Sequence, residues 1–177
     1  LNNMFKNDRQ DFEKKWDDVK VFIEYGMLTE DKFNEKANKF FLFKNIEDKY
    51  FTVEEYLEKV KEIQKNKDGK VILLYAADKD LQHTYIEKAT ERGYDVLMID
   101  GPLSSHIISK LEQSNTNISF ARVDADTIDK LIKKEEEMPS KLSKEQEEIL
   151  KPLFENNIDK GKFSVLFESM SETDAPI

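Results

Sequence analysis

Apolar side chains in the first part of the chain recur with the period of an α-helix. Four of them stand at positions i, i+4, i+7 and i+11, namely Phe12, Trp16, Val19 and Ile23. Residues at this spacing lie on one stripe of a helix, and we expect that stripe to be buried. Gly26 follows shortly afterwards, and glycine readily takes the left-handed conformation that ends helices, so the helix is expected to stop there.

A second helix is expected to begin directly after this glycine. Thr29 can cap it, and its predicted apolar face consists of Phe33, Ala37, Phe40 and Phe41. The aromatic run that ends this segment could also form a sticky patch for another chain. We favour a place in the core, because a unit this small needs most of its large side chains inside.

The start of a third helix carries two signals that support each other. Thr52 and Glu55 have the spacing of a capping box, in which each side chain binds the backbone N–H of the other residue. Phe51 and Tyr56 stand at the two positions of a hydrophobic staple. We therefore predict three helices that share one small core in residues 1–66.

From residue 67 onward the apolar pattern changes to that of buried strands. Short apolar runs stand at Val71–Tyr75, Val96–Ile99 and Ile118–Val123, with a helical pattern between each pair. Strands that alternate with helices are typical of a parallel sheet with right-handed crossovers. We therefore predict a small parallel α/β unit over residues 67–137.

A charged stretch separates this unit from the last part of the chain. Residues 138–142 are predicted to be a linker, and Ser143 with Gln146 forms a second capping box. Residues 163–167 alternate like a half-buried strand that has no visible partner. The predicted fold is thus mixed α and α/β: a three-helix unit, a small parallel α/β unit, and an incomplete helix-plus-strand start of a further domain over residues 143–177.

Composition restricts the classes of partner. The 177 residues carry 28 basic and 37 acidic side chains, a formal net charge of −9, so nucleic acid is not an expected partner. The chain has no cysteine, which excludes disulfides and zinc–thiolate sites and favours a reducing compartment such as the cytoplasm. The longest apolar run, residues 71–77, is far shorter than the roughly 20 residues that span a bilayer, so no membrane contact is expected.

The sharpest chemical pattern is a set of acids that follow the predicted strands. Asp78, Asp100 and Asp124 each fall at or just past a carboxyl end, where open α/β sheets place ligands. Three converging carboxylates could hold a magnesium ion for phosphoryl transfer, as in a receiver-like domain. Aspartate is also common at this place because it turns the chain and caps the next helix. We favour the capping role, since a chain with 5 glycines contains neither a Walker sequence nor a GxGxxG motif.

Six segments in fixed order carry a family resemblance, and they are Asp11–Trp16, Ile23–Gly26, Phe51–Tyr56, Ile72–Ala77, Gly93–Leu97 and Phe120–Asp124. Together they resemble the ninety-kilodalton heat-shock chaperone family over nearly the whole chain. The resemblance rests on the order and spacing of the segments and not on a catalytic signature. Because the chain opens at Leu1, we also expect it to be a piece of a longer protein.

The resemblance implies that residues 1–66 are the helical subdomain of the family's middle domain and residues 67–137 its small α/β subdomain. Residues 143–177 would then begin the C-terminal domain. In this family ATP and magnesium bind a separate N-terminal domain, and helices late in the C-terminal domain form the homodimer. The segment is therefore expected to be monomeric, to hold no catalytic, cofactor or metal site, and not to be an enzyme, although the parent resembles an ATPase that acts in protein folding and the stress response.

The resemblance also implies that unfolded or partly folded client proteins are the partners. The segment would relay nucleotide-driven closure and present a client surface on the inner face of its α/β subdomain. We expect the contact at the helix after the second strand, where Leu103, His106, Ile107 and Lys110 can form a mixed apolar and polar edge. Two alternatives remain: the apolar side chains of this helix pack on the sheet, or the segment is a spacer without client contact.

Overall fold

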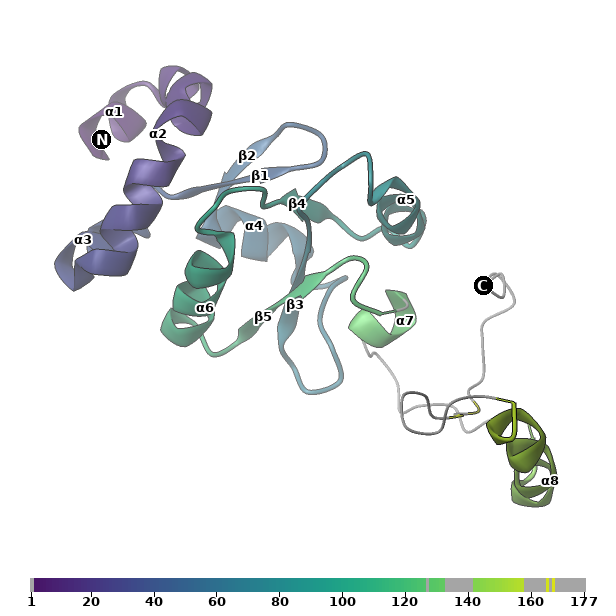
Figure 1. The fold of residues 1–177 in the computed structure, drawn as a ribbon. Coiled ribbons are helices and arrows are strands. Elements are labelled where there is room, and N and C mark those ends of the chain that lie inside the picture. The colour runs from purple at the N-terminus through teal and green to yellow at the C-terminus, as the bar shows by residue number, and fades with distance from the viewer. Residues whose placement is uncertain (1, 127, 133–141, 158–164, 166, 168–177) are drawn as a thin grey trace. The chain divides into compact units, whose positions relative to one another are not determined.

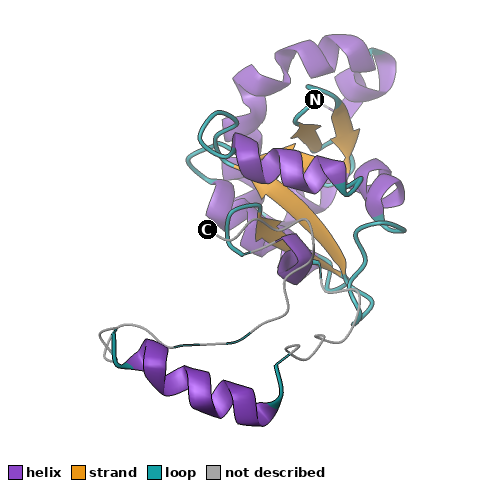
Figure 2. Cartoon of the chain, turned by 90° about the vertical axis from the view of Figure 1, so that its right-hand side faces the viewer, coloured by secondary structure: helices purple, strands orange, loops and turns teal. Residues whose placement is uncertain are grey.

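The structure is a computed structural model that describes residues 2–126, 128–132 and 142–157, together with Val165 and Phe167. Contacts divide the chain into two units, residues 1–134 and residues 135–177, and each is considered by itself. In the first unit, helices cover both faces of a five-stranded sheet (Figures 1 and 2). Its elements in chain order are α1 (Asn2–Asn7), α2 (Arg9–Thr29), α3 (Asp31–Ala37), β1 (Leu42–Asn45), β2 (Tyr50–Thr52), α4 (Val53–Val60), β3 (Val71–Ala76), α5 (His83–Glu91), β4 (Val96–Met98), α6 (Ser104–Ser114), β5 (Ile118–Arg122) and α7 (Ile128–Leu131).

The strands pair in the order β2-β1-β4-β3-β5. β3 lies between two parallel neighbours, with Leu74 opposite Val96 on β4 and Leu73 opposite Phe120 on β5. These three parallel strands and the helices between them are the predicted α/β unit. The mixed α and α/β fold class is therefore confirmed.

The structure adds a hairpin that the sequence analysis did not predict. β1 and β2 pair antiparallel, and β1 also pairs antiparallel with β4, with Asn45 opposite Leu97. The description of residues 1–66 as purely helical was wrong for this reason. The physical cause is non-local, because the edge of β4 offers hydrogen-bond partners that lie about 50 residues further along the chain.

The aromatic run lies at the start of this hairpin and in the core. Phe40 and Phe41 come after α3 and not on it, while Leu42 and Phe43 enter the sheet. All four side chains are 2–4% exposed, as expected for core residues and not for a patch. The run fits a helical stripe as well as a strand, which explains the wrong assignment.

Alternate residues of β3 face two separate cores. Leu73 belongs to the larger core, which it shares with residues of α2, α4 and α6. Ile72 and Leu74 belong to a smaller core with residues of α5 and α7. A strand that is covered on both faces was predicted from its continuous apolar run and is confirmed.

The junction of α2 and α3 differs from the prediction. α2 continues through Gly26 to Thr29, whose hydroxyl donates to the carbonyl of Tyr25 at 2.9 Å, and Glu30 caps both helices instead. Glycine is needed at position 26 for another reason. A Cβ there would lie 2.8 Å from Cε1 of Phe33, so the missing side chain lets α3 fold back closely on α2.

Replacing Gly26 with alanine is expected to lower the free energy of unfolding by about 1 kcal/mol. The added methyl group overpacks the junction, and this cost exceeds the gain in helix propensity. Urea unfolding followed by circular dichroism measures the change. In a Phe33→Leu background, where the ring is absent, the same substitution at Gly26 should cost much less. A Gly26→Ala variant as stable as the unchanged chain would contradict this explanation.

Both predicted capping boxes are present. The hydroxyl of Thr52 accepts the N–H of Glu55 at 3.2 Å, and the carboxylate of Glu55 accepts the N–H of Thr52 at 2.8 Å. The rings of Phe51 and Tyr56 lie 5.7 Å apart, which is the predicted staple contact. Both signals depend only on residues within one turn of the helix start, and both were predicted correctly.

The second unit is described around α8 (Lys144–Glu155), which begins at the predicted box of Ser143 and continues past Pro152. The ring of Phe154 lies 6.3 Å from that of Phe167.

The linker at residues 138–142 and the strand at residues 163–167 fall largely outside the described residues. The division at residue 66 and the C-terminal domain likewise stay predictions. None of the helices in the described part of the chain is long and apolar enough to cross a membrane.

Candidate functional site

The three acids that follow the parallel strands serve separate local roles. Asp78 accepts backbone N–H groups two and three residues later, as a capping aspartate does. Asp100 pairs with Lys20 of α2, and Asp124 pairs with Arg122. Within the described ranges, no three histidine, aspartate or glutamate side chains lie close enough together to hold a metal ion. The alternative of a shared magnesium site for phosphoryl transfer was therefore wrong.

The predicted client edge at the start of α6 is only partly a surface. His106 is exposed and Leu103 is half-buried, as the prediction requires. Ile107 is 2% exposed and belongs to the larger core, so its assignment to the edge was wrong. The Nζ of Lys110 binds Asp31 of α3 at 2.9 Å and thereby lowers the pKa of that carboxyl group. Client contact at Leu103, His106 and Lys110 stays a prediction.

Ion pairs join the helices α2 and α3 to the rest of the first unit. Pairs of this kind, near the surface, contribute about 0–1 kcal/mol each, so the buried apolar face of α2 supplies most of the stability of this junction. The pairs instead fix the position of α2 along the sheet. They are Arg9–Glu55, Asp17–Lys44, Lys20–Asp100 and Asp31–Lys110.

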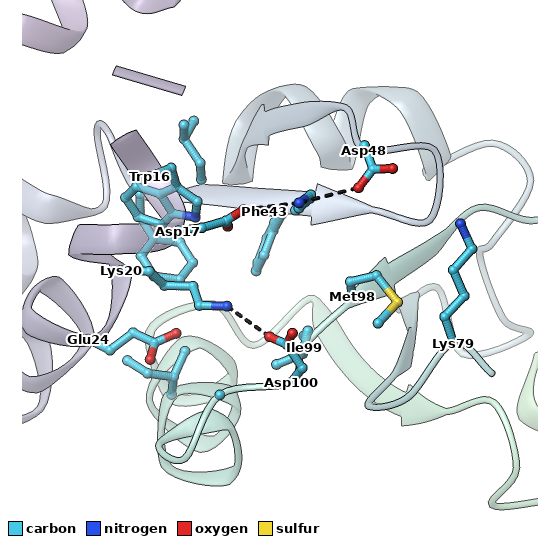
Figure 3. Close-up of a pocket in the computed structure, with 15 residues that line it drawn as sticks. Trp16, Asp17, Lys20, Glu24, Phe43, Asp48, Lys79, Met98, Ile99 and Asp100 are labelled. Atoms are coloured by element: carbon cyan, nitrogen blue, oxygen red, sulfur yellow. Dashed lines mark hydrogen bonds and ion pairs between the residues drawn. The ribbon is translucent and has the colours of Figure 1, made fainter. Parts of the chain in front are cut away.

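A cavity of about 460 Å³ lies where α2 meets β1 and the end of β4 (Figure 3). Charged groups and a hydrophobic wall both line it. The main residues of the wall are Trp16, Phe41, Phe43, Met98 and Ile107. The charged residues are Asp17, Lys20, Glu24, Lys44, Asp48, Lys79 and Asp100.

Three of the four carboxylates in this lining have lysine partners. Lys44 contacts Asp17 at 3.0 Å and Asp48 at 3.3 Å. The Nζ of Lys20 lies 2.9 Å from Asp100, and this pair lowers the pKa of the aspartate. Each of these three carboxylates thus has an ion-pair partner within the chain.

Glu24 is the exception. Its side chain is only 3% exposed, and its Oε2 has no hydrogen-bond partner among the described residues. Burial raises the pKa of Glu24, Lys20 one turn earlier opposes that shift, and Asp100 adds to it. The indole Nε1 of Trp16 is likewise buried without a partner in the described part of the chain. Two residues of the lining thus each carry a buried polar atom without a partner in the described part of the chain.

Replacing Glu24 with glutamine is expected to stabilise the protein increasingly as the pH rises. Because the pKa of Glu24 is raised in the folded state, the folded protein keeps this proton at pH values where the unfolded chain has lost it. The stability that the proton contributes is fully present below the unfolded pKa and is lost as the pH passes the folded pKa. Urea unfolding of both proteins between about pH 4 and pH 8 measures this difference.

The matched control for this prediction is Glu35→Gln on the exposed face of α3. Its stability should follow that of the unchanged chain at every pH. A difference between the Glu24→Gln variant and the unchanged chain that does not vary with pH would contradict the prediction.

Two of the cavity residues could have been found in the sequence. Lys20 and Glu24 stand four and eight residues after Trp16, so they lie on the same stripe of the helix as that buried ring. A lysine and a glutamate on an apolar stripe signal either a buried pair or a site. Neither residue was predicted, because only the apolar residues of the stripe were taken as a sign of burial.

Comparisons with known proteins identify the chain. A search of protein-family models finds no match. The chaperone protein HtpG of Porphyromonas gingivalis is 47% identical over 173 residues, which cover 96% of this chain. HtpG of Bacteroides thetaiotaomicron is 45% identical over 180 residues and covers 100% of this chain. The chain belongs to the HtpG family. It spans 25–26% of the length of these HtpG relatives.

A solved structure agrees with the HtpG assignment at the level of the fold. The middle domain of a putative heat shock protein of Plasmodium falciparum matches with a TM-score of 0.54 and 18% identity. The match covers 71% of this chain and 52% of that chain. The family resemblance seen in the order of the sequence segments is therefore confirmed, and the HtpG segment has the fold of part of a middle domain.

Proposed function

We propose that this segment is part of the middle domain of an HtpG chaperone, where it holds unfolded or partly folded client proteins and transmits ATP-driven closure of the parent. The observation that carries the proposal is the 47% identity to an HtpG chaperone over 96% of the chain. In such a relay a ligand shifts a population between two states through contacts that differ between them. The segment must then move as one body.

The packing of the first unit supports this role. Residues 1–134 form one compact unit, and the larger core includes Trp16 from α2, Leu73 from β3 and Ile107 from α6. The ion pairs between α2, α3 and the rest of the unit add directional contacts. A body that is held together in this way can transmit a displacement without deforming.

The proposal assigns the chemistry of ATP to the rest of the parent. ATP and magnesium would bind outside this segment, the homodimer would form through later helices, and the segment itself would hold no catalytic residue. Client binding would take place in the cytoplasm, which the absence of cysteine supports. Residues 143–177 would begin the C-terminal domain.

An amide-resolved titration of the segment with an unfolded model protein, at low and at moderate salt, tests client contact. We expect weak, salt-sensitive shifts that include Leu103, His106 and Lys110 at the start of α6. Addition of ATP and magnesium without client should leave the amide spectrum unchanged. If millimolar client shifts no amide, the segment is a spacer and the client-holding part of the proposal is wrong.

A further inference from the structure

We propose that the cavity between α2 and the sheet binds the side chain of a lysine in the client polypeptide, an ammonium group on an apolar stem. The inference rests on the proposed function, because it takes polypeptide as the ligand. Beyond the proposed function, the inference names a binding site, formed by α2, β1 and the end of β4. It also names the chemical class of client residue that this site selects.

The hydrophobic wall suits the stem of a lysine. Met98 and Ile99 are half-buried and supply the accessible apolar surface of the lining, and the rings of Trp16, Phe41 and Phe43 lie buried behind them. Lysine buries its four methylene groups along apolar surface while its charged head stays with polar partners. The faces of aromatic rings also attract a cation nearby.

The charges of the lining leave room for one more cation. Four carboxyl groups (Asp17, Glu24, Asp48 and Asp100) face three lysines (Lys20, Lys44 and Lys79), so the lining has one more carboxyl group than lysines, 4 − 3 = 1. Lys79 donates to the backbone carbonyl of Ile46 and not to a carboxylate of the cavity. The unmet acceptor is therefore a carboxyl group.

Two neighbouring carboxyl groups can receive that cation. The Oε2 of Glu24 has no hydrogen-bond partner in the described part of the chain, and Asp100 is 56% exposed with Lys20 as its ion-pair partner. An ammonium group brings three donors, and each carboxylate oxygen can accept more than one hydrogen bond. An ammonium ion between Glu24 and Asp100 would satisfy both.

Lys20 already shows the chemistry of such a complex. Its stem lies between Trp16 and Glu24, and its Nζ reaches Asp100 at 2.9 Å (Figure 3). Its side chain is 23% exposed and comes from the helix surface, so it can swing out or share the site with a second ammonium group. The chain's own lysine thus stands where a client lysine would bind.

Trp16 is the only tryptophan of the chain, so its fluorescence reports directly on this cavity. The 177-residue protein is titrated with an unstructured peptide in which one lysine stands between leucine and serine residues, and with the same peptide carrying glutamine instead. We expect the lysine peptide to bind about tenfold more tightly, since hydrogen bonds to charged groups are the stronger ones. Glu24→Gln and Asp100→Asn should each reduce this preference, and the exposed Glu35→Gln control should keep it.

The outcomes separate the inference from the function on which it rests. If both peptides bind equally, client binding stands and the lysine site is overturned. If the lysine preference survives in both Glu24→Gln and Asp100→Asn, the ammonium group binds elsewhere and the inference is overturned as well. If neither peptide binds the unchanged protein, the client-holding role of this segment fails together with the inference.

Discussion

An Asp95→Ala variant is expected to unfold with a free energy about 3–5 kcal/mol below that of the unchanged chain, because it leaves buried polar groups without their partner. The side chain of Asp95 is 13% exposed and pairs with Lys59. It also accepts hydrogen bonds from Asn45, at 3.1 and 3.2 Å, and from the hydroxyl of Tyr56 at 3.4 Å. Asn45 and Tyr56 are fully buried, so each loses an acceptor inside the core.

Urea unfolding followed by the fluorescence of Trp16, which lies in the same unit, measures this loss. The matched control is Glu58→Ala, which removes an exposed carboxylate that pairs with Lys61 on the solvent side. The control should lie within about 1 kcal/mol of the unchanged chain. Equal losses in Asp95→Ala and Glu58→Ala would show that the buried network does not hold the hairpin and α4 on the sheet.

Replacing Trp16 with alanine is expected to cost about 3–5 kcal/mol of unfolding free energy. The side chain is 0% exposed, and its ring lies 5.7 Å from that of Phe12 and 5.3 Å from that of Phe41. Its removal leaves a void between α2 and β1 that the surrounding rings cannot fill. Circular dichroism in urea measures the effect, since the variant has no tryptophan.

The matched variant Trp16→Phe separates packing from hydrogen bonding. The indole Nε1 has no partner in the described part of the chain, so its loss should cost nothing by itself. We expect a loss well below that of Trp16→Ala, because phenylalanine keeps most of the ring contacts. Equal losses in the two variants would mean that the indole N–H makes a bond on which the fold depends.

Local signals allowed much of the first unit to be predicted from the sequence. Thr52 and Glu55 satisfy each other within one turn, so the start of α4 depends on no distant contact. The parallel strands could be predicted for a similar reason, because an apolar run such as that of β3 has to be covered on both faces.

The hairpin and the helix junction could not be predicted in this way. β1 joins the sheet because β4, far along the chain, offers a free edge, and no property of the aromatic run itself reports that edge. The prediction for Gly26 failed for the same reason. A left-handed helix stop was a reasonable expectation, but the glycine instead leaves space for the ring of Phe33, which lies on α3. Each outcome depends on residues that the local pattern does not contain.

The same distinction between local pattern and distant packing applies to the candidate site. The stripe of α2 already placed Lys20 and Glu24 beside Trp16, and this part of the cavity was accessible to sequence analysis. That Asp100 comes to lie against this stripe follows only from the packing of β4 and α6 on α2. Ile107 is buried in the larger core because of the same packing, so it is not part of the predicted client edge.

The most direct test of the account is to exchange the segment within a complete HtpG chaperone. HtpG of Bacteroides thetaiotaomicron is suitable, because its matching segment is 45% identical over 180 residues. A chimera that contains this chain should fold and protect an unfolded model protein from aggregation in an ATP-dependent manner, as the recipient does. A chimera that folds and hydrolyses ATP like the recipient but no longer protects the client would contradict the proposal that this segment holds client protein and relays closure.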